Sequence, residues 1–559
     1  MKVKFVSKLN KMSETVFLVL SKKSALKNIG FNDKHLKEIT KSIENKGFGF
    51  KLNEIIEINS IKDRKLKTVY ICGLGNKTKD LSAFDFEKIG GRITELTKLK
   101  TKTSVIIDKE INNKIIIENI KADTLNGGLI LPGGFESLVV TEGVGPSRHL
   151  AVNNNGDIYV KLRTATGRNG NVALRDTNGD GKADIIERFG DYPNDGKFGT
   201  EMKINEGYLY YSSELVVYRQ KLSENQLIPI GKPEIIVVDP YPIRWHNAKS
   251  LAFDKNDNIY VTFSAPTNAC EDWDSKPNTY STRDVKGQYP CEQLDILAGI
   301  WKFNKNTLGQ DISDGERYAT GIRSVVGLTW NNLTNSLYGV NHGRDFLYNH
   351  APQFYSEWDN AILPAEEFMK ISEGDDFGWP YTYYNQFKNE RIIAPEYGGD
   401  SNKKAAESYA NPIMGLPAHW APNDLLFYTG NQFPERYKNG AFIAFHGSTN
   451  RVPYPQAGYV VGFIPFKEGK PNGDLEIFAD GFAGKEILVD MEDAKYRPMG
   501  LAQGPDGSLF ISESKKGKIW RVFFSGDRNN FGEKELDSMV KREERSYTKI
   551  PDKINDRIE

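Results

Sequence analysis

Residues 249–263 read KSLAFDKNDNIYVTF, in which two apolar runs flank a polar turn rich in Asp and Asn. This pattern predicts a β-hairpin with alternating apolar residues on each strand. Related stretches begin at Arg148 (RHLAVNNNGDIYVKL), Val326 (VGLTWNNLTNSLYGV) and Met499 (MGLAQGPDGSLFISE), with weaker copies at Met202 and Asp424. Strand–turn–strand units repeated in this way predict an all-β propeller over residues 125–525. Six blades with long insertions fit the length, and seven blades are the alternative.

Residues 1–123 have a different pattern, in which strand-like and helical segments alternate. Strands are predicted at 15–20, 54–58, 68–74 and 104–108, and helices at 33–47 and 82–100. This order predicts a small α/β domain with a mainly parallel or mixed sheet. A Gly-Leu-Gly turn at residues 73–75 lacks the third glycine and the later acidic residue of a dinucleotide fingerprint, so it is a weak signal.

Composition and charge exclude several classes of protein. The 559 residues carry no net charge, although residues 1–123 hold 26 Lys and Arg against 15 Asp and Glu. These basic residues are scattered without interleaved aromatics, which favours solvated helix faces over a nucleic-acid partner. No apolar run is long enough for a membrane span, and the run at 16–20 is too short for an export signal. The charged tail, residues 527–559, predicts a solvated helix followed by disorder.

Three cysteines are present. Cys72 lies in an apolar strand and is predicted to be a buried thiol. Cys270 and Cys291 flank a polar loop and are predicted to form a disulfide. A disulfide suits an oxidising compartment, which conflicts with the absence of an export signal in the printed sequence.

Four basic residues stand just ahead of predicted repeats: Arg148, His246, Arg323 and Arg497. Because the innermost strand of each blade begins near the central channel, these side chains are expected to converge there. Their charges would repel one another unless an anionic ligand lies between them. The alternative is that each of them pairs locally with a carboxylate. His149, His350, His419 and His446 are weaker candidates with structural roles or places along the channel.

Two segments are candidates for calcium. In NHGRDFLYN, residues 341–349, the main-chain carbonyls of Gly343 and Arg344 could face the channel, while Asp345 orients a metal-bound water or caps the turn. In DTNGDGKADIIE, residues 176–187, the spacing matches a calcium-binding loop. The ligands of that loop would be Asp176, Asn178, Asp180, Lys182, Asp184 and Glu187. The alternative is a polar hairpin turn without metal, since its flanks are predicted strands.

From about 129 to 522 the chain resembles the soluble pyrroloquinoline quinone (PQQ) dehydrogenases of the glucose/sorbosone dehydrogenase family, nearest the sorbosone branch. The stretches that carry the resemblance include WHNAKSLAF, TGIRSVVGLTW, VNHGRDFL, GDDFGWPYTYY and YRPMGLAQGPDGSLFISE, in family order. The resemblance implies a six-bladed propeller with PQQ and Ca²⁺ at its mouth. His246 matches the general base and Arg323 the arginine beside the quinone oxygen. Gly343 and Arg344 match the carbonyl ligands of the calcium, and Arg148, Arg451 and Arg497 are expected near the cofactor carboxylates.

The resemblance has departures and consequences. Trp245 stands where the glucose branch has an aspartate, residues 324–327 replace its Asn-Pro-Gln-Gly, and Arg344 replaces a proline. The implied activity is oxidation of a sugar or a sugar-derived alcohol or aldehyde. A separate electron acceptor is needed because no haem motif is present. The resemblance implies a periplasmic or secreted protein, whereas the printed sequence reads as cytoplasmic. A non-catalytic binding module and a metal-dependent sugar lactonase are the alternatives.

Residues 1–123 resemble the N-terminal domain of leucyl aminopeptidases. The resemblance rests on VYICGLGNKTKDLSAFDFEKIGGRITELTKLKTKTSVIID, residues 69–108. The metal-binding motifs of the peptidase domain are not found in the chain, so no peptidase activity is inferred. This domain is expected to be a scaffold or an oligomerisation element.

Overall fold

The structure is a computed structural model that describes residues 120–545, apart from gaps at 167–168, 192–197, 224–225, 242–245 and 272–285. Of the first 119 residues it describes 5–6, 15–20, 33–46, 55–58, 68–73 and 103–107. The chain divides into two compact units, Met1–Asn119 and Ile120–Glu559. The boundary predicted from the sequence, near residue 123, lies a few residues after this one. Asp123 lies in the second unit, where its carboxylate accepts a hydrogen bond from Val139 N over 2.8 Å.

The N-terminal unit contains one sheet with the strand order β1-β5-β2-β4-β3. Its described elements are β1 (Phe5–Val6), β2 (Thr15–Leu20), α1 (Asp33–Asn45), β3 (Ile55–Ile58), β4 (Thr68–Gly73) and β5 (Thr103–Ile107). All pairings are parallel except that of β3 with β4, so the sheet is mixed, as predicted. Cys72 is buried in β4. The helix predicted at 82–100 lies outside the described residues.

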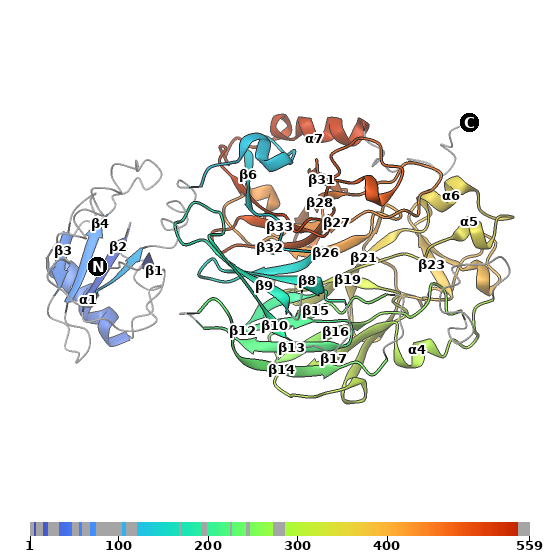
Figure 1. Ribbon diagram of the computed structural model, residues 1–559, viewed down its shortest axis with the longest axis horizontal. Coiled ribbons are helices and arrows are strands. Elements are labelled where there is room, and N and C mark those ends of the chain that lie inside the picture. Colours follow the sequence, from blue (N-terminus) through green and yellow to red (C-terminus); the bar gives the residue numbers. More distant parts are fainter. Residues whose placement is uncertain are drawn as a thin grey trace. The chain divides into compact units, whose positions relative to one another are not determined.

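The second unit is a six-bladed β-propeller, as predicted (Figure 1). The strands of the first three blades are β7 (Ser147–Val152), β8 (Ile158–Thr166), β9 (Asn169–Arg175), β10 (Ile185–Asp191); β11 (Met202–Asn205), β12 (Tyr208–Ser212), β13 (Val216–Lys221), β14 (Ile230–Val238); and β15 (Leu251–Phe253), β16 (Asn258–Phe263), β17 (Gly299–Asn304), β18 (Glu316–Thr320), with β22 (Asp375–Asp376) added at the edge. The strands of the last three are β19 (Val325–Asn331), β20 (Ser336–Asn341), β21 (Glu366–Ile371), β25 (Met414–Leu416); β26 (Pro422–Phe427), β27 (Ala441–Phe445), β28 (Val460–Ile464), β31 (Glu476–Ala479); and β32 (Pro498–Gln503), β33 (Leu509–Glu513), β34 (Ile519–Phe524), β6 (Phe135–Thr141).

The sixth blade closes the ring with strands from both ends of the unit. β6 pairs antiparallel with β34, so that Phe135 lies opposite Phe524. Figure 1 shows β6 in cyan among the orange and red strands of the C-terminal blade. This pairing leaves no open gap between the first and last blades, and it holds the start of the unit to its end.

The predicted hairpins form the first two strands of their blades, and their polar turns are held by side-chain hydrogen bonds. In the first blade the Asp157 carboxylate accepts two hydrogen bonds of 2.6 Å from Arg175 on the third strand. In the sixth blade Arg521 donates to Asp506 over 2.8 Å in the same way. The repeated motif therefore fixes the turn to the sheet as well as forming it.

Segments between the strands carry short elements outside the blades. These are the 3-10 turns at Thr124–Gly128, Ile312–Asp314, Pro395–Tyr397, Glu435–Tyr437 and Met491–Asp493, the helices α4 (Gln293–Ile296), α5 (Leu347–His350) and α6 (Glu357–Ile362), and the small strands β23 (Thr382–Asn385), β24 (Glu390–Ile393), β29 (Phe466–Lys467) and β30 (Lys470–Pro471). The predicted disulfide joins Cys270 and Cys291, whose Cα atoms are 6.1 Å apart.

The charged C-terminal segment differs in part from the sequence prediction of a solvated helix. α7 (Glu533–Arg545) does form there, but Met539 is buried in the propeller core and Arg542 Nε donates to Asp480 over 2.7 Å. The apolar side chain explains the difference, because a helix in solution would leave it in water. Among the described residues, no helix is long and apolar enough to cross a bilayer.

Candidate active site

His246 lies shortly before β15, the innermost strand of the third blade. Its Nδ1 atom is 3.1 Å from the main-chain oxygen of Ala265. A carbonyl oxygen only accepts, so Nδ1 carries the hydrogen and the ring lone pair is on Nε2. Burial, and next the positive charge of Arg323, hold the pKa of His246 well below its ordinary value. The ring is therefore a neutral imidazole with a basic nitrogen at neutral pH. Trp245 is outside the described residues.

Arg323 is almost completely buried just ahead of β19. Its Nη2 atom donates to Asp345 over 2.8 Å and to the side-chain oxygen of Asn268 over 3.0 Å. Its Nη1 atom donates to the carbonyl oxygen of Gly343 over 2.7 Å. The guanidinium is thus held in one orientation by residues of the third and fourth blades and by the turn after β20.

Asp345 is the acidic partner at this centre. Its second oxygen accepts a hydrogen bond of 2.6 Å from Asn450 and lies 3.4 Å from Nδ1 of His419. Burial raises the pKa of Asp345, but the positive Arg323, followed by His419 and His246, outweighs burial and holds it far below its ordinary value. Asp345 is therefore a carboxylate at neutral pH.

A second group of positive side chains, Arg148, Arg163 and Arg497, comes from the first and sixth blades. Burial, then the charges of Arg163 and Arg497, lower the pKa of Arg148 to about 9. Within the described part of the chain, Arg148 donates no side-chain hydrogen bond, and its buried Nε atom has no partner. Arg497 donates to the main-chain oxygens of His446 and Gly447. The positive charges of these arginines repel one another, and the group is therefore suited to bind an anion.

His446 and His342 connect the two groups electrostatically. The pKa of His446 is held well below its ordinary value by burial and by Arg497, Arg148 and Arg163, with a further contribution from His342. Burial and Arg323 lower the pKa of His342 to about 4. The four residues expected at the channel mouth, Arg148, His246, Arg323 and Arg497, therefore belong to one continuous field. Arg323 pairs with a local carboxylate, that of Asp345, as the alternative hypothesis expects for each of them.

The turn after β20 is supported from behind by a buried acid. Glu366 accepts hydrogen bonds from Gly343 N over 2.8 Å and from Ala421 N over 3.1 Å. Burial raises its pKa to about 7. The side chain of Arg344 points to a different acid, since it forms a buried ion pair with Glu396. Only the main chain of Gly343 and Arg344 is thus left for the predicted calcium site.

The structure separates Arg451 from the other predicted cofactor residues. Its Nε atom donates to Pro455 O over 3.0 Å and its Nη1 atom donates to Ala361 O over 2.9 Å. Burial lowers its pKa to about 10. Main-chain carbonyls of α6 and of the segment after Arg451 thus hold this guanidinium, whereas Asn450, one residue earlier, donates to Asp345.

Residues 176–184 join β9 to β10 as a hairpin connection, and side-chain oxygens of this loop accept hydrogen bonds from the loop's own N–H groups. Asp176 accepts from Asn178 N, Gly179 N and Gly181 N, and Asp184 accepts from Thr177 N. Asn178 accepts from Asp180 N, Asp180 accepts from Lys182 N, and Lys182 pairs with Asp123. Glu187 lies in β10 opposite Ala173. Calcium binding by this loop stays a prediction.

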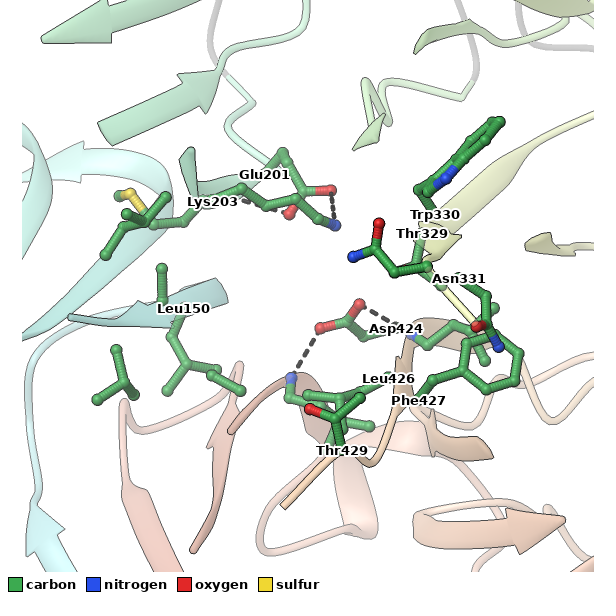
Figure 2. Close-up of a pocket in the computed structure, with 18 of the residues that line it drawn as sticks. Leu150, Glu201, Lys203, Thr329, Trp330, Asn331, Asp424, Leu426, Phe427 and Thr429 are labelled. Carbon is green, nitrogen blue, oxygen red and sulfur yellow. Dashed lines mark hydrogen bonds and ion pairs between the residues drawn. The ribbon is translucent and has the colours of Figure 1, made fainter. Parts of the chain in front are cut away.

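A cavity of about 350 Å³ opens at the other end of the innermost strands (Figure 2). Figure 2 shows Glu201, Lys203 and Asp424 around it. Along both β19 and β32, a residue of the channel mouth is followed by a buried apolar residue and then by a residue that lines the cavity. The buried residues are Val326 and Met499, which form a cluster with Ala248. None of the predicted site residues lines the cavity. The channel mouth and the cavity are therefore separate.

Comparison with known proteins assigns the propeller to a family. The TrAA12-like family model matches residues 129–523. The chain belongs to the TrAA12-like family. This TrAA12-like chain is similar in fold to the calcium structure of the family AA12 carbohydrate-active enzyme of Trichoderma reesei (17% identity, 72% of this chain, 98% of that chain, TM-score 0.56). It is also similar to the PQQ domain of pyranose dehydrogenase from Coprinopsis cinerea (15% identity, 72% and 98% covered, TM-score 0.54).

One curated relative of the TrAA12-like chain also matches. It is an uncharacterized protein of Borreliella burgdorferi, 30% identical over 230 residues, or 41% of this chain. The chain spans about half the length of that relative, 52%. The likeness to the leucyl aminopeptidase N-terminal domain stays a sequence-based prediction.

Several residues of the TrAA12-like site were missed from sequence alone. Asn268, His342, Asn450, Glu366 and Arg163 lie within loops or strands far apart in the chain. His342 lies inside the quoted motif NHGRDFLYN and Asn450 directly precedes the predicted Arg451, so their positions were usable signals. Asn268 gave none, because it contacts Asp345 across 77 positions of sequence.

Proposed function

We propose that the protein is a PQQ- and calcium-dependent dehydrogenase that oxidises a sugar or a sugar-derived alcohol or aldehyde. The observation that carries the proposal is the group of arginines and histidines at the channel mouth, with a basic imidazole beside a buried arginine. The cofactor is a tricarboxylic quinone, and when bound it supplies the acceptor for a hydride. The pyranose dehydrogenase similarity and the family support this chemistry. The sorbosone-like or glucose-like specificity is part of the proposal.

The residues of the site fit an anionic cofactor. Arg148 is a half-buried cation whose buried Nε atom has no partner, and two other arginines lower its pKa. A carboxylate placed among these arginines would relieve the repulsion and supply the missing hydrogen-bond acceptor. Arg148 and Arg497 would therefore hold carboxylates of the cofactor. Arg451 is left out of this role because burial alone lowers its pKa, with no contribution from another arginine, so there is no repulsion for an anion to relieve.

A calcium ion would depend on main-chain oxygens. Among the described residues no group of three or more His, Cys, Asp and Glu side chains could hold a metal ion. The carbonyl oxygen of Gly343 accepts one hydrogen bond from Arg323, and a carbonyl has two lone pairs, so one remains for a hard cation. The proposed ligands are the carbonyls of Gly343 and Arg344, completed by oxygens of the cofactor and water.

His246 would remove the proton of the substrate hydroxyl. Its Nδ1–H is held by Ala265 O, which directs the basic Nε2 lone pair away from that carbonyl. Arg323 would stabilise negative charge that develops next to it, since its guanidinium is already oriented by Asp345 and Asn268. The two residues therefore have different tasks, proton removal and charge stabilisation.

The test is a titration of the purified protein with PQQ in the presence of Ca²⁺, followed by absorbance, with reduction of an artificial dye on addition of sugars. Saturable binding at one PQQ per chain and dye reduction that depends on both PQQ and sugar are expected. Binding of sugar without PQQ uptake points to a binding module, and metal-dependent hydrolysis of a sugar lactone points to a lactonase. Either of these outcomes overturns the proposal.

A further inference from the structure

The segment that follows β16 connects the proposed base with the arginine. Ala265 accepts the Nδ1–H of His246 through its carbonyl oxygen and donates its own N–H to the main-chain oxygen of Arg323 over 2.8 Å. One residue thus holds both proposed site residues, which come from the third and fourth blades. Ala265 and the following Asn268 are completely buried, so their positions are fixed by packing.

Asn268 extends this connection with its side chain. Its Oδ1 atom accepts from Asp345 N over 2.9 Å and its Nδ2 atom donates to Asp345 O over 3.0 Å. The amide therefore pairs with both polar groups of the Asp345 main chain, as a neighbouring strand would. The same Oδ1 atom accepts from Nη2 of Arg323 over 3.0 Å. The contacts require a carbonyl oxygen and an NH₂ group on the same side-chain carbon, which only Asn and Gln supply.

The segment is anchored beyond Asn268. Trp379 Nε1 donates to the main-chain oxygen of Asn268 over 2.9 Å, and the Tyr397 hydroxyl donates to that of Ala269 over 3.0 Å. Cys270, two residues after Asn268, forms the disulfide with Cys291. These contacts hold the main chain on either side of Asn268 in place. The Asn268 amide is therefore fixed in position relative to the groups that it contacts.

We propose that Asn268 is a positioning residue that sets the guanidinium of Arg323 and the main chain of Asp345 relative to each other and to His246. This inference rests on the proposed function for its consequence in catalysis. A buried asparagine that serves only folding would also be hydrogen-bonded. Within the described ranges, however, the three side-chain hydrogen bonds of Asn268 go to the Arg323–Asp345 pair and none goes to its own blade.

The experiment compares three variants of the full chain. Asn268→Ala removes all three bonds, whereas Asn268→Asp keeps the oxygen that accepts from Arg323 and from Asp345 N. Gln293→Ala is the matched control, because Gln293 is an equally buried amide in the same region that bonds only to Thr267 and to the carbonyl of Glu271. Thermal unfolding of each variant shows whether it is folded.

Two readouts need no cofactor. Labelling of Arg323 with phenylglyoxal, followed by peptide mass spectrometry, reports how well its guanidinium is held. Hydrogen exchange of the peptide containing Asp345 reports the bond from its N–H to Asn268. Both labelling and exchange are expected to rise at least several-fold in Asn268→Ala, to rise less in Asn268→Asp, and to stay at the wild-type rate in Gln293→Ala.

Two further readouts use PQQ. Asn268→Ala is expected to weaken PQQ binding and to lower kcat by roughly 10–100-fold, with a smaller change in KM, because a misplaced group affects the reaction more than sugar binding. Asn268→Asp should recover part of both losses. A purely structural role predicts that Asn268→Ala and Gln293→Ala behave alike in every readout.

The outcomes separate this inference from the proposed function. If the wild-type protein takes up no PQQ, the proposed function fails, and labelling and exchange still decide whether Asn268 positions the pair. If Asn268→Ala is folded and shows wild-type labelling of Arg323 and wild-type exchange at Asp345, the inference is overturned. If Asn268→Ala does not fold, Asn268→Asp decides: faster exchange than in Gln293→Ala supports the inference, and an equal rate overturns it.

Discussion

His246 Nδ1 lies 3.1 Å from the carbonyl oxygen of Ala265, and this single contact fixes which ring nitrogen is the base. The sequence places a tryptophan directly before His246, where the glucose branch was expected to have an aspartate. A main-chain carbonyl orients the ring instead. A carbonyl cannot take up the ring proton, and it adds no negative charge that would raise the pKa of the imidazole. The hydrogen bond to Ala265 and the charge of Asp345 raise the pKa of His246, but burial, followed by Arg323, outweighs them and holds that pKa well below its ordinary value.

His246→Ala is expected to lower turnover by roughly 10²–10⁴-fold, the usual contribution of a positioned base. PQQ affinity should stay close to that of the wild type, because the proposed cofactor contacts are arginines and carbonyls. Stopped-flow reduction of bound PQQ by sugar measures the first quantity and absorbance titration the second. Near wild-type reduction across several sugars would make His246 a packing residue.

The pH dependence of the same step is expected to be shifted to acid. A pKa lowered from its ordinary value of 6.5 leaves His246 neutral over the whole neutral range. The rate of PQQ reduction should therefore stay level as the pH falls to 6.5 and decline only below it. A rate that halves near pH 6.5 or above contradicts the assignment of His246 as a buried base.

Arg148→Met and Arg451→Met should differ in a diagnostic way. Arg148 is a cation in the fields of Arg163 and Arg497, so its removal should leave the melting temperature of the cofactor-free protein unchanged or higher while weakening PQQ binding. Arg451 bonds to two main-chain carbonyls, so its removal should lower stability by roughly 1–3 kcal/mol with little effect on PQQ affinity. Melting curves with and without PQQ measure both effects, and the reverse pattern would assign the anion to Arg451.

Calcium removal is expected to abolish PQQ binding, since the proposed ion joins an anionic cofactor to carbonyl oxygens. Titration in excess chelator, followed by restoration with Ca²⁺, tests this. One calcium per chain at the channel mouth is expected by elemental analysis, and a second calcium would support the predicted site in the 176–187 loop. Stoichiometric PQQ uptake in excess chelator contradicts the proposed role of Gly343 and Arg344.

Glu201 should make the propeller sensitive to acid. Burial raises its pKa, but Lys203 and His149 outweigh burial and lower it to about 2 from the ordinary 4.5. A lowered carboxyl pKa stabilises the folded state above the unfolded pKa, and this contribution is lost as the pH falls from 4.5 toward 2. Glu201→Gln should cost on the order of 3 kcal/mol at pH 7 and less at pH 3, by denaturant unfolding. Glu373→Gln, an exposed partner of Lys302, is the control and should show little change at either pH.

The structure decided between six blades and seven, but the sequence by itself determined the propeller of repeated units and the α/β character of the N-terminal unit. Both follow from local patterns, since the alternation in stretches such as 249–263 specifies a hairpin wherever it occurs, and each unit can bury its apolar face only against another copy. The pairing of Cys270 with Cys291 was also within reach, because it needs only two cysteines at the ends of one loop. The candidate residues at the channel mouth could also be predicted, because each of them stands just ahead of one of these repeats.

Only the tertiary structure decided what those candidates contact. Arg323, Asp345 and Asn268 come from separate strands and loops, and the meeting of their side chains depends on how neighbouring blades pack. Arg148 and Arg451 were predicted from the sequence for the same role, to bind the cofactor carboxylates. In the structure Arg148 lies in the field of other arginines, whereas the guanidinium of Arg451 donates to main-chain carbonyls. Hydrogen-bond partners are set by the direction of each side chain within a closed ring of blades. A pattern of residue types along the chain specifies the strands but not those directions.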